Sequence, residues 1–241
     1  MNVLEFGGRR QDPAIRWLYD MRDVLYDQKW AASAENVELY YMYRDLYLSL
    51  ADRDRLIDIG IRYDITIIPP RMLGSEYVKT TGHYHPVVPG GSVSYPELYE
   101  VLEGEALYLL QRSDLTDVVV VKALSGDKVL VPPGYGHITI NASNKRLKMA
   151  NFVARDFSSE YDAIREMAGG AYYLTVDGYI RNEHYSNVPP LRFVNAMGNN
   201  VLKRFGLSRS REMYPGLRDP GGLAYLTSPD EYPEIFEGLI E

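Results

Sequence analysis

The sequence predicts a mainly β protein: an antiparallel β-sandwich or barrel with helical extensions at its N- and C-terminal ends. Between residues 57 and 154, short apolar runs rich in β-branched residues follow one another closely. The segments between these runs carry glycine, proline or clusters of polar residues, which are typical of turns. Many short strands at close spacing favour a sandwich or barrel, and 241 residues are enough for one sizeable core plus extensions.

The central part of the chain is expected to supply these strands. The first run alternates apolar and polar residues and ends at Pro69-Pro70. We therefore divide the chain into an N-terminal extension (1–56), a β domain (57–173) and a C-terminal extension (174–241). The expected strands are 57–69, 77–84, 97–102, 106–111, 117–123, 128–131, 137–141 and 147–154.

The N-terminal extension carries a helical signal. Asp12-Pro13 can begin a helix, because proline is well tolerated at the first helical position. Apolar residues then recur three or four positions apart, at Ile15, Leu18, Met21 and Leu25. Residues 37–50 fit a helix and a strand equally well, and both readings stay open.

The C-terminal extension is less regular. Residues 171–180 are expected to be extended, 188–190 to form a linker, and 219–222 to form a turn. Residues 230–239 are expected to form a last short helix. Another helix is indicated by apolar residues three or four apart, at Val194, Met197, Val201 and Phe205. The extension is too small and polar for its own core, so we expect it to pack on the β domain or on a partner subunit.

Composition excludes several classes of protein. No run approaches the roughly 18 apolar residues of a membrane-spanning helix. The N-terminus lacks the apolar stretch of a signal peptide, so we expect a cytoplasmic protein. A net charge of −7 argues against nucleic-acid binding, which needs a basic surface. Without cysteine the chain has neither disulfides nor a thiolate metal site.

Three of the four histidines and one glutamate form the strongest functional signal. His83 and His85 are separated by one residue, and a strand places residues i and i+2 on the same face, about 6.6 Å apart. Glu97 opens a second strand-like run, and His137 lies in a third segment, GDKVLVPPGYGHITIN. Imidazoles and a carboxylate in segments of this kind indicate a metal site.

These segments resemble the two motifs of the cupin superfamily. The second motif is matched at every spacing by Gly126-x5-Pro132-x-Gly134-x2-His137-x3-Asn141. The first is matched by His83-x-His85 and by Glu97-x6-Gly104, with eleven residues between His85 and Glu97 instead of three or four. The sequence around these motifs, over residues 17–173, resembles the cupin-type phosphoglucose isomerases, known mainly from archaea. The segments that carry this are DITIIPP (64–70), KTTGHYHP (79–86), YPELYEVLEG (95–104) and YLLQ (108–111).

The resemblance implies a double-stranded β-helix, or jelly-roll-like sandwich, and a set of site residues. The implied metal ligands are His83, His85, Glu97 and His137. The implied substrate contacts are Thr80, Gly82 and Tyr161, with Tyr99 two residues after Glu97, and Lys79 can assist in holding a phosphate. A histidine that some family members carry is Ser159 here, so any proton shuttle by that histidine must pass to water or another group.

The implied reaction is metal-dependent isomerisation of glucose 6-phosphate to fructose 6-phosphate. Such a reaction needs a base near C1 and C2 and a cation that stabilises the developing oxyanion. Glu97 is the candidate base and Tyr99 would orient the substrate or relay a proton; a metal-promoted hydride shift stays open. The ligands suit one divalent ion per subunit, Fe(II) first, with Mn(II), Ni(II) or Zn(II) as alternatives.

Two other readings stay open at this point. An Fe(II) oxygenase could use the same fold and ligands, and a non-catalytic cupin could bind a sugar phosphate without turning it over. We also expect a homodimer, because sandwiches of this kind commonly pair through edge strands.

Overall fold

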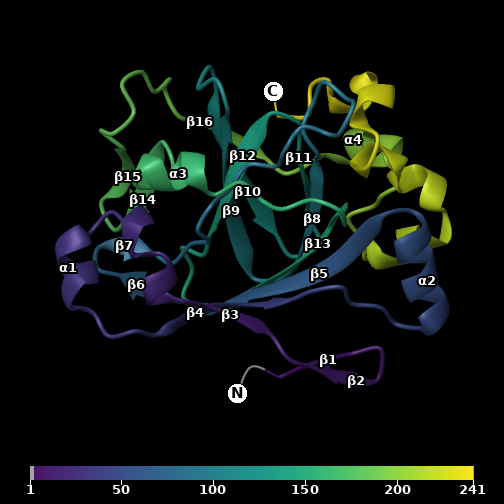
Figure 1. Cartoon of the computed structure of the whole chain (residues 1–241), viewed down its shortest axis with the longest axis horizontal. Coiled ribbons are helices and arrows are strands. Elements are labelled where there is room, and N and C mark those ends of the chain that lie inside the picture. The colour runs from purple at the N-terminus through teal and green to yellow at the C-terminus, as the bar shows by residue number, and fades with distance from the viewer. Residues whose placement is uncertain (1–2, 241) are drawn as a thin grey trace.

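Two β-sheets face each other and enclose the main core (Figure 1). The computed structural model describes residues 3–240. The larger sheet has six strands in the order β11-β8-β13-β5-β4-β3, and all its pairs are antiparallel. These strands are β3 (Ala14–Trp17), β4 (Glu38–Tyr43), β5 (Ile61–Ile68), β8 (Glu97–Glu103), β11 (Lys128–Val131) and β13 (Leu147–Ala154).

The facing sheet has four strands in the order β12-β9-β10-β16, with a parallel pair between β10 and β16. Its strands are β9 (Glu105–Arg112), β10 (Val118–Leu124), β12 (Tyr135–Ile140) and β16 (Arg192–Asn195). The remaining strands are β1 (Leu4–Phe6), β2 (Arg9–Gln11), β6 (Met72–Leu73), β7 (Glu76–Tyr77), β14 (Tyr172–Thr175) and β15 (Gly178–Arg181).

The helices are short and lie at the two ends of the sandwich (Figure 1). They are α1 (Gln28–Ser33), α2 (Leu50–Asp58), α3 (Asp162–Glu166) and α4 (Asn199–Arg204). 3₁₀ turns occur at Leu18–Asp20, Arg22–Val24, Tyr214–Arg218, Pro220–Leu226, Pro229–Glu231 and Pro233–Phe236. Among the described residues, no helix is long and apolar enough to cross a membrane.

Strand alternation divides the apolar residues into three layers. In β8, Tyr99 and Val101 point into the core between the sheets, whereas Leu98 belongs to the outer face of the six-stranded sheet. That outer face is covered by α2 and by the C-terminal residues from Met197 onward. The outer face of the four-stranded sheet is covered by β14 and neighbouring residues such as Ala171 and Tyr185. Both sheets are therefore buried on both faces.

The C-terminal segment is also fixed to the sheet by polar contacts. The Met213 N–H donates to Glu100 Oε2 (2.7 Å), and Lys128 Nζ donates to the Arg211 carbonyl (2.7 Å). Lys128 Nζ lies 3.0 Å from Glu100 Oε1, and both side chains are almost fully buried. Of the two alternatives expected for this extension, the β domain and a partner subunit, the structure shows packing on the β domain.

The mainly β, antiparallel prediction is confirmed, and the strands expected at 128–131 and 147–154 have the observed bounds. Residues 37–50, left open, form strand β4 followed by the start of α2. The helix expected from Pro13 is wrong: residues 14–17 pair with β4, and 3₁₀ turns follow. Pairing at the edge of the sheet thus overrides the helical spacing of the apolar side chains.

Other predicted elements need correction. The strand expected from residue 57 begins at Ile61, because α2, capped by Ser49 accepting from the Asp52 N–H, continues to Asp58. The strand expected at 77–84 is reduced to β7 and isolated bridges, since Gly82 adopts φ +84°, which strands do not. The boundaries expected at 56/57 and 173/174 fall inside α2 and β14.

The C-terminal predictions are partly confirmed. The extended segment expected at 171–180 contains β14 and the start of β15. A helix is present where the apolar spacing indicated one, but it is α4 alone, and the residues before it form the unpredicted strand β16. The turn expected at 219–222 opens a 3₁₀ helix, and the helix expected at 230–239 is replaced by two 3₁₀ turns.

Candidate metal centre

The segment that carries His83 and His85 runs beside β12, which carries His137. The His83 N–H donates to the His137 carbonyl (3.3 Å), and the His137 N–H donates back to the His83 carbonyl (3.1 Å). Gly82 allows this approach, because a Cβ at that position would collide with the Ile138 side chain. The backbone contact thus brings histidines 54 positions apart together.

Glu97 completes the cluster from the facing sheet. It is the first residue of β8, and its Oε2 lies 3.1 Å from His137 Nε2 and 3.4 Å from His85 Nε2. The Nε2 atoms of His83 and His85 are 3.2 Å apart. One ligand atom from each of the four residues lies within 4.8 Å of all the others. The structure therefore brings together the whole ligand set expected from the sequence.

His85 is oriented by a contact on its outer side. Its Nδ1 lies 2.9 Å from the carbonyl oxygen of Tyr95. Because a carbonyl can only accept, Nδ1 must carry the proton, which leaves the lone pair of Nε2 directed into the cluster. Phe157 packs on His85 (centroids 4.6 Å apart) and stacks on Tyr95 (4.9 Å), so the imidazole is held on two sides.

Burial sets the charges in the cluster. Desolvation, followed by the neighbouring His137, lowers the pKa of His83 well below its ordinary value, and desolvation lowers the pKa of His85 to about 4. For Glu97, burial acts to raise the pKa, but contacts with His137 and His85 outweigh it and lower the pKa. Neutral imidazoles and an ionised carboxylate are the protonation states that bind metal ions.

The donor set fits a divalent transition metal. Glu97 Oε2 is buried, and the described residues provide it with no well-aligned hydrogen bond. An unsatisfied buried carboxylate oxygen beside imidazole lone pairs is costly unless a cation joins them. Three imidazoles and one carboxylate suit Fe(II), Mn(II), Ni(II) or Zn(II), and four protein ligands leave room for substrate oxygens in an octahedral shell.

A cavity opens over the cluster, and one face of the six-stranded sheet forms part of its wall. Its wall contains several predicted substrate contacts: Thr80, Gly82, Tyr99, Tyr161, and also Ser159. Tyr99 OH lies 3.1 Å from His137 Nε2, and burial followed by the charge of Glu97 raises the pKa of Tyr99 well above its usual range. Tyr99 is therefore a neutral phenol beside the cluster.

Lys79 is not among the residues that line this cavity. Its side chain is buried, with Nζ 2.5 Å from Glu76 Oε1 and donating to the Val24 carbonyl (2.8 Å). The expectation that Lys79 assists in holding a phosphate is corrected: its charge is already neutralised inside the protein.

Sequence reasoning missed much of the cavity wall. The missed residues occur at every second position along three neighbouring strands, with Arg44 just beyond the end of β4: Tyr40, Met42 and Arg44; Arg62, Asp64 and Thr66; Met149, Asn151 and Val153. A signal was available in β5, where polar residues recur with period two inside an otherwise apolar strand. Arg62 pairs with Asp64 (2.8 Å), whereas Arg44 forms no ion pair with any described carboxylate.

Comparisons with known proteins identify a family for most of this chain. Residues 16–189 match the profile of the family described as glucose-6-phosphate isomerase (GPI). One relative is the glucose-6-phosphate isomerase of Thermococcus litoralis, which is 26% identical over 64% of this chain and 75% of that protein. Another is the glucose-6-phosphate isomerase of Pyrococcus furiosus, which is 23% identical over 70% of this chain and 84% of that protein. Among solved structures, a cupin 2 conserved barrel domain protein from Salinispora arenicola aligns with a TM-score of 0.33, at 16% identity over 47% of this chain and 73% of that chain. The family profile covers well over half of the chain, which therefore belongs to the glucose-6-phosphate isomerase family, as its motifs predict.

Proposed function

We propose that this protein is a metal-dependent isomerase that interconverts glucose 6-phosphate and fructose 6-phosphate. The observation that carries the proposal is the buried cluster of His83, His85, Glu97 and His137 at the floor of a cavity with a polar wall. Family membership names the reaction, and the cluster supplies groups that such a reaction requires. The same four residues would hold the metal, which when bound supplies Lewis-acid stabilisation of negative charge on the substrate oxygens.

Glu97 is the group we assign to proton transfer between C1 and C2. Its lowered pKa keeps it ionised at neutral pH, so it can accept a proton from one carbon of the aldose and return it to the other through an enediol. The neighbouring Tyr99 stays protonated, so its hydroxyl can donate a hydrogen bond to a substrate oxygen. Both groups project from β8, which holds them two residues apart on one face.

The phosphate end of the substrate is assigned to another part of the wall. Thr80 and Tyr161 offer hydroxyls and Gly82 offers a backbone N–H, as the family resemblance implies. Since Lys79 is buried elsewhere, the positive charge must come from another residue. Arg44 is exposed and lines the cavity, and its Nη2 contacts Met42 Sδ at 3.4 Å. Its guanidinium is paired with no carboxylate of the described residues 3–240, so it is able to bind a phosphate.

The test is a coupled assay that follows both directions of the reaction while oxygen uptake is recorded in parallel. The proposal predicts interconversion of the two hexose phosphates, no oxygen consumption, and much weaker activity on glucose and fructose without phosphate. Oxygen consumption with a substrate of this class would favour the oxygenase reading. Binding of glucose 6-phosphate without turnover in metal-loaded protein would favour a binding protein.

A further inference from the structure

The loop between the ligands His85 and Glu97 is folded as a hairpin-like projection. The Val88 N–H donates to the Val93 carbonyl (3.0 Å), and the Tyr95 N–H donates to the Pro86 carbonyl (3.2 Å). A turn closes the tip, where the Gly91 N–H donates to the Val88 carbonyl (2.8 Å). Residues 86–96 thus form one unit, and a displacement of its tip can reach its base.

The base of this loop contacts both segments that carry metal ligands. The Tyr95 carbonyl accepts from Nδ1 of His85, which fixes the direction of Nε2. Ser94 Oγ accepts from the Gly134 N–H (2.8 Å), in the turn that leads into the strand of His137. The position of the loop therefore bears on the orientation of the ligand set.

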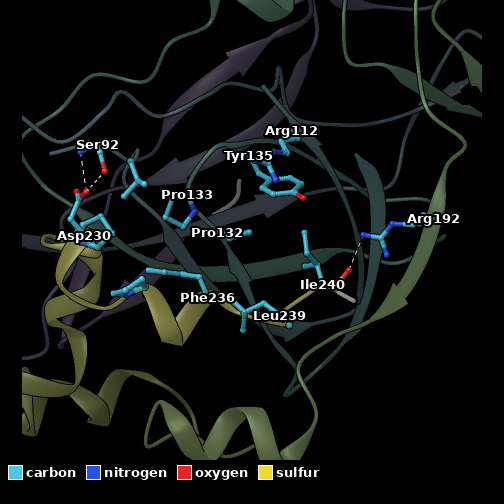
Figure 2. Close-up of a pocket in the computed structure, with 14 residues that line it drawn as sticks. Ser92, Arg112, Pro132, Pro133, Tyr135, Arg192, Asp230, Phe236, Leu239 and Ile240 are labelled. Carbon is cyan, nitrogen blue, oxygen red and sulfur yellow. Dashed lines mark hydrogen bonds between the residues drawn. The ribbon is translucent and has the colours of Figure 1, made fainter. Parts of the chain in front are cut away.

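The tip of the loop is held by a residue far away in the sequence. Asp230 Oδ1 accepts from the Ser92 N–H (2.9 Å) and from the Ser92 hydroxyl, as the dashed lines in Figure 2 show. The other oxygen, Oδ2, lies so close to Gly91 that a Cβ there would collide with it. Glycine at position 91 is therefore part of how the carboxylate reaches the loop.

The segment that carries Asp230 is itself attached to the sandwich. Ile235, Phe236 and Leu239 pack against the core on the outer face of the six-stranded sheet, and Arg192 Nη2 donates to the Ile240 carbonyl (2.9 Å). Between this segment and the Pro132–Tyr135 turn lies a cavity of about 510 Å³ (Figure 2). Asp230 lies at one side of that cavity, where the segment and the loop meet, and the segment is outside residues 16–189 that match the family.

We propose that residues 229–240 form a strap that holds loop 86–96 in place, and that Asp230 is a positioning residue for the metal ligand His85. This inference rests on the metal centre proposed above. The strap acts through the loop: it restrains the tip, the hairpin carries the restraint to Tyr95, and the Tyr95 carbonyl keeps His85 Nε2 directed at the metal.

The expected loss of metal affinity on substitution of Asp230 follows from the number of contacts between Asp230 and the metal. Loss of a direct partner of a metal ligand typically lowers metal affinity about 10- to 100-fold. Asp230 acts further out, through Ser92 and the hairpin, and Phe157 still holds Tyr95 from the other side, so we expect a fall of about three- to tenfold. Amide exchange in loop 86–96 should rise, because its tip loses two hydrogen bonds.

The test compares Asp230→Ala with Asp230→Asn in the full-length protein. Hydrogen exchange of residues 86–96 is measured by mass spectrometry, and Co²⁺ affinity by competition with a chelator while the visible spectrum reports the ligand geometry. Asp230→Ala should speed exchange in the loop, weaken Co²⁺ binding three- to tenfold and broaden the Co²⁺ bands. Asp230→Asn should remain close to wild type, because both contacts with Ser92 use Oδ1, which the amide retains.

Two further variants control this comparison. Asp114→Ala removes an exposed carboxylate that accepts from Thr116 N–H and Oγ1 in the same way, but within its own turn, and it should change neither readout. Gly91→Ala, which displaces the Asp230 carboxylate by collision, should reproduce the effect of Asp230→Ala. Unchanged exchange and unchanged Co²⁺ affinity in Asp230→Ala would overturn the strap.

Failure of the metal centre would be distinguishable from failure of the strap. Wild-type protein that binds no Co²⁺ would overturn the centre and the positioning role of Asp230 together, while loop exchange, which needs no metal, would still decide whether the strap holds the loop. If wild-type protein binds Co²⁺ and the Asp230→Ala variant binds it with the same affinity, the positioning role alone would be overturned.

Discussion

Replacing Lys128 by methionine should destabilise the protein strongly, although the residue lies outside the metal centre. Lys128 Nζ lies 3.0 Å from Glu100 Oε1, and its side chain is 0% exposed. Methionine fills a similar volume but leaves the Glu100 carboxylate buried with the Met213 N–H as a remaining donor. The pair joins β11 and β8, the strand that carries Glu97, to the C-terminal segment, so the substitution tests how firmly that segment is attached.

The magnitude follows from burial. Breaking a buried ion pair by removal of one partner costs about 3–5 kcal/mol of unfolding free energy. For a chain of this length each kcal/mol lowers the melting temperature by about 2–4 °C, so we expect a fall of at least about 6 °C by calorimetry. The matched control is Lys122→Met, which removes an exposed pair with Glu105 at the same 3.0 Å distance and should cost less than about 1 kcal/mol.

The penalty should also depend on pH. Burial already raises the pKa of Glu100 above its ordinary value of 4.5, and loss of the Lys128 charge raises it further. Above pH 4.5 the unfolded chain releases the Glu100 proton, whereas the folded variant still holds it. The folded variant therefore loses stability as pH rises, so the penalty grows as pH rises and shrinks as pH falls toward 4.5. A loss of under 1 kcal/mol at pH 7, equal to that of Lys122→Met, would refute this reasoning.

Three further predictions concern the cavity. His85→Ala should lower metal content and turnover together while circular dichroism still shows the β-sheets; full metal content in the variant would remove His85 from the ligands. Tyr99→Phe should lower kcat about tenfold or more with metal content unchanged, because only the hydroxyl is lost; wild-type kcat would remove Tyr99 from the mechanism. Arg44→Gln should raise the KM for glucose 6-phosphate about tenfold and leave kcat near wild type, through loss of a charge-assisted hydrogen bond. Arg53→Gln, an exposed arginine of α2 paired with Asp54, is its control, and equal KM values in the two variants would contradict the assignment.

The fold was predictable where the local pattern and the tertiary environment agree. Residues 147–154 are mostly apolar, and β13 lies between two other strands, so neighbouring strands reinforce the local pattern. Residues 15–25 have helical spacing, but the backbone of residues 14–17 pairs with β4, a partner that no local window contains, and the rest form 3₁₀ turns. Gly82 likewise interrupts an expected strand because the approach to Ile138 requires a positive φ.

The candidate site was likewise predictable only where local sequence patterns determine it. The ligands were predictable because His83 and His85 lie two residues apart and the spacing around Glu97 and His137 matches known motifs. Arg44 was not predictable as part of the cavity, because its place there depends on how β4 pairs with β5 and β5 with β13. Lys79 was assigned to the cavity from proximity in sequence, whereas the structure turns it toward Glu76. The expected homodimer stays a prediction.

The most direct test of the central claim is a metal titration of activity. The purified protein is stripped with a chelator, its metal content is measured, and Fe(II), Mn(II), Ni(II) or Zn(II) is added back while the conversion of fructose 6-phosphate to glucose 6-phosphate is followed. We expect activity to be lost with the metal and to return with a recovery that saturates at one ion per chain, and we expect no recovery in a His83→Ala and His137→Ala double variant. Full activity in protein shown to be free of metal would overturn the proposed metal dependence.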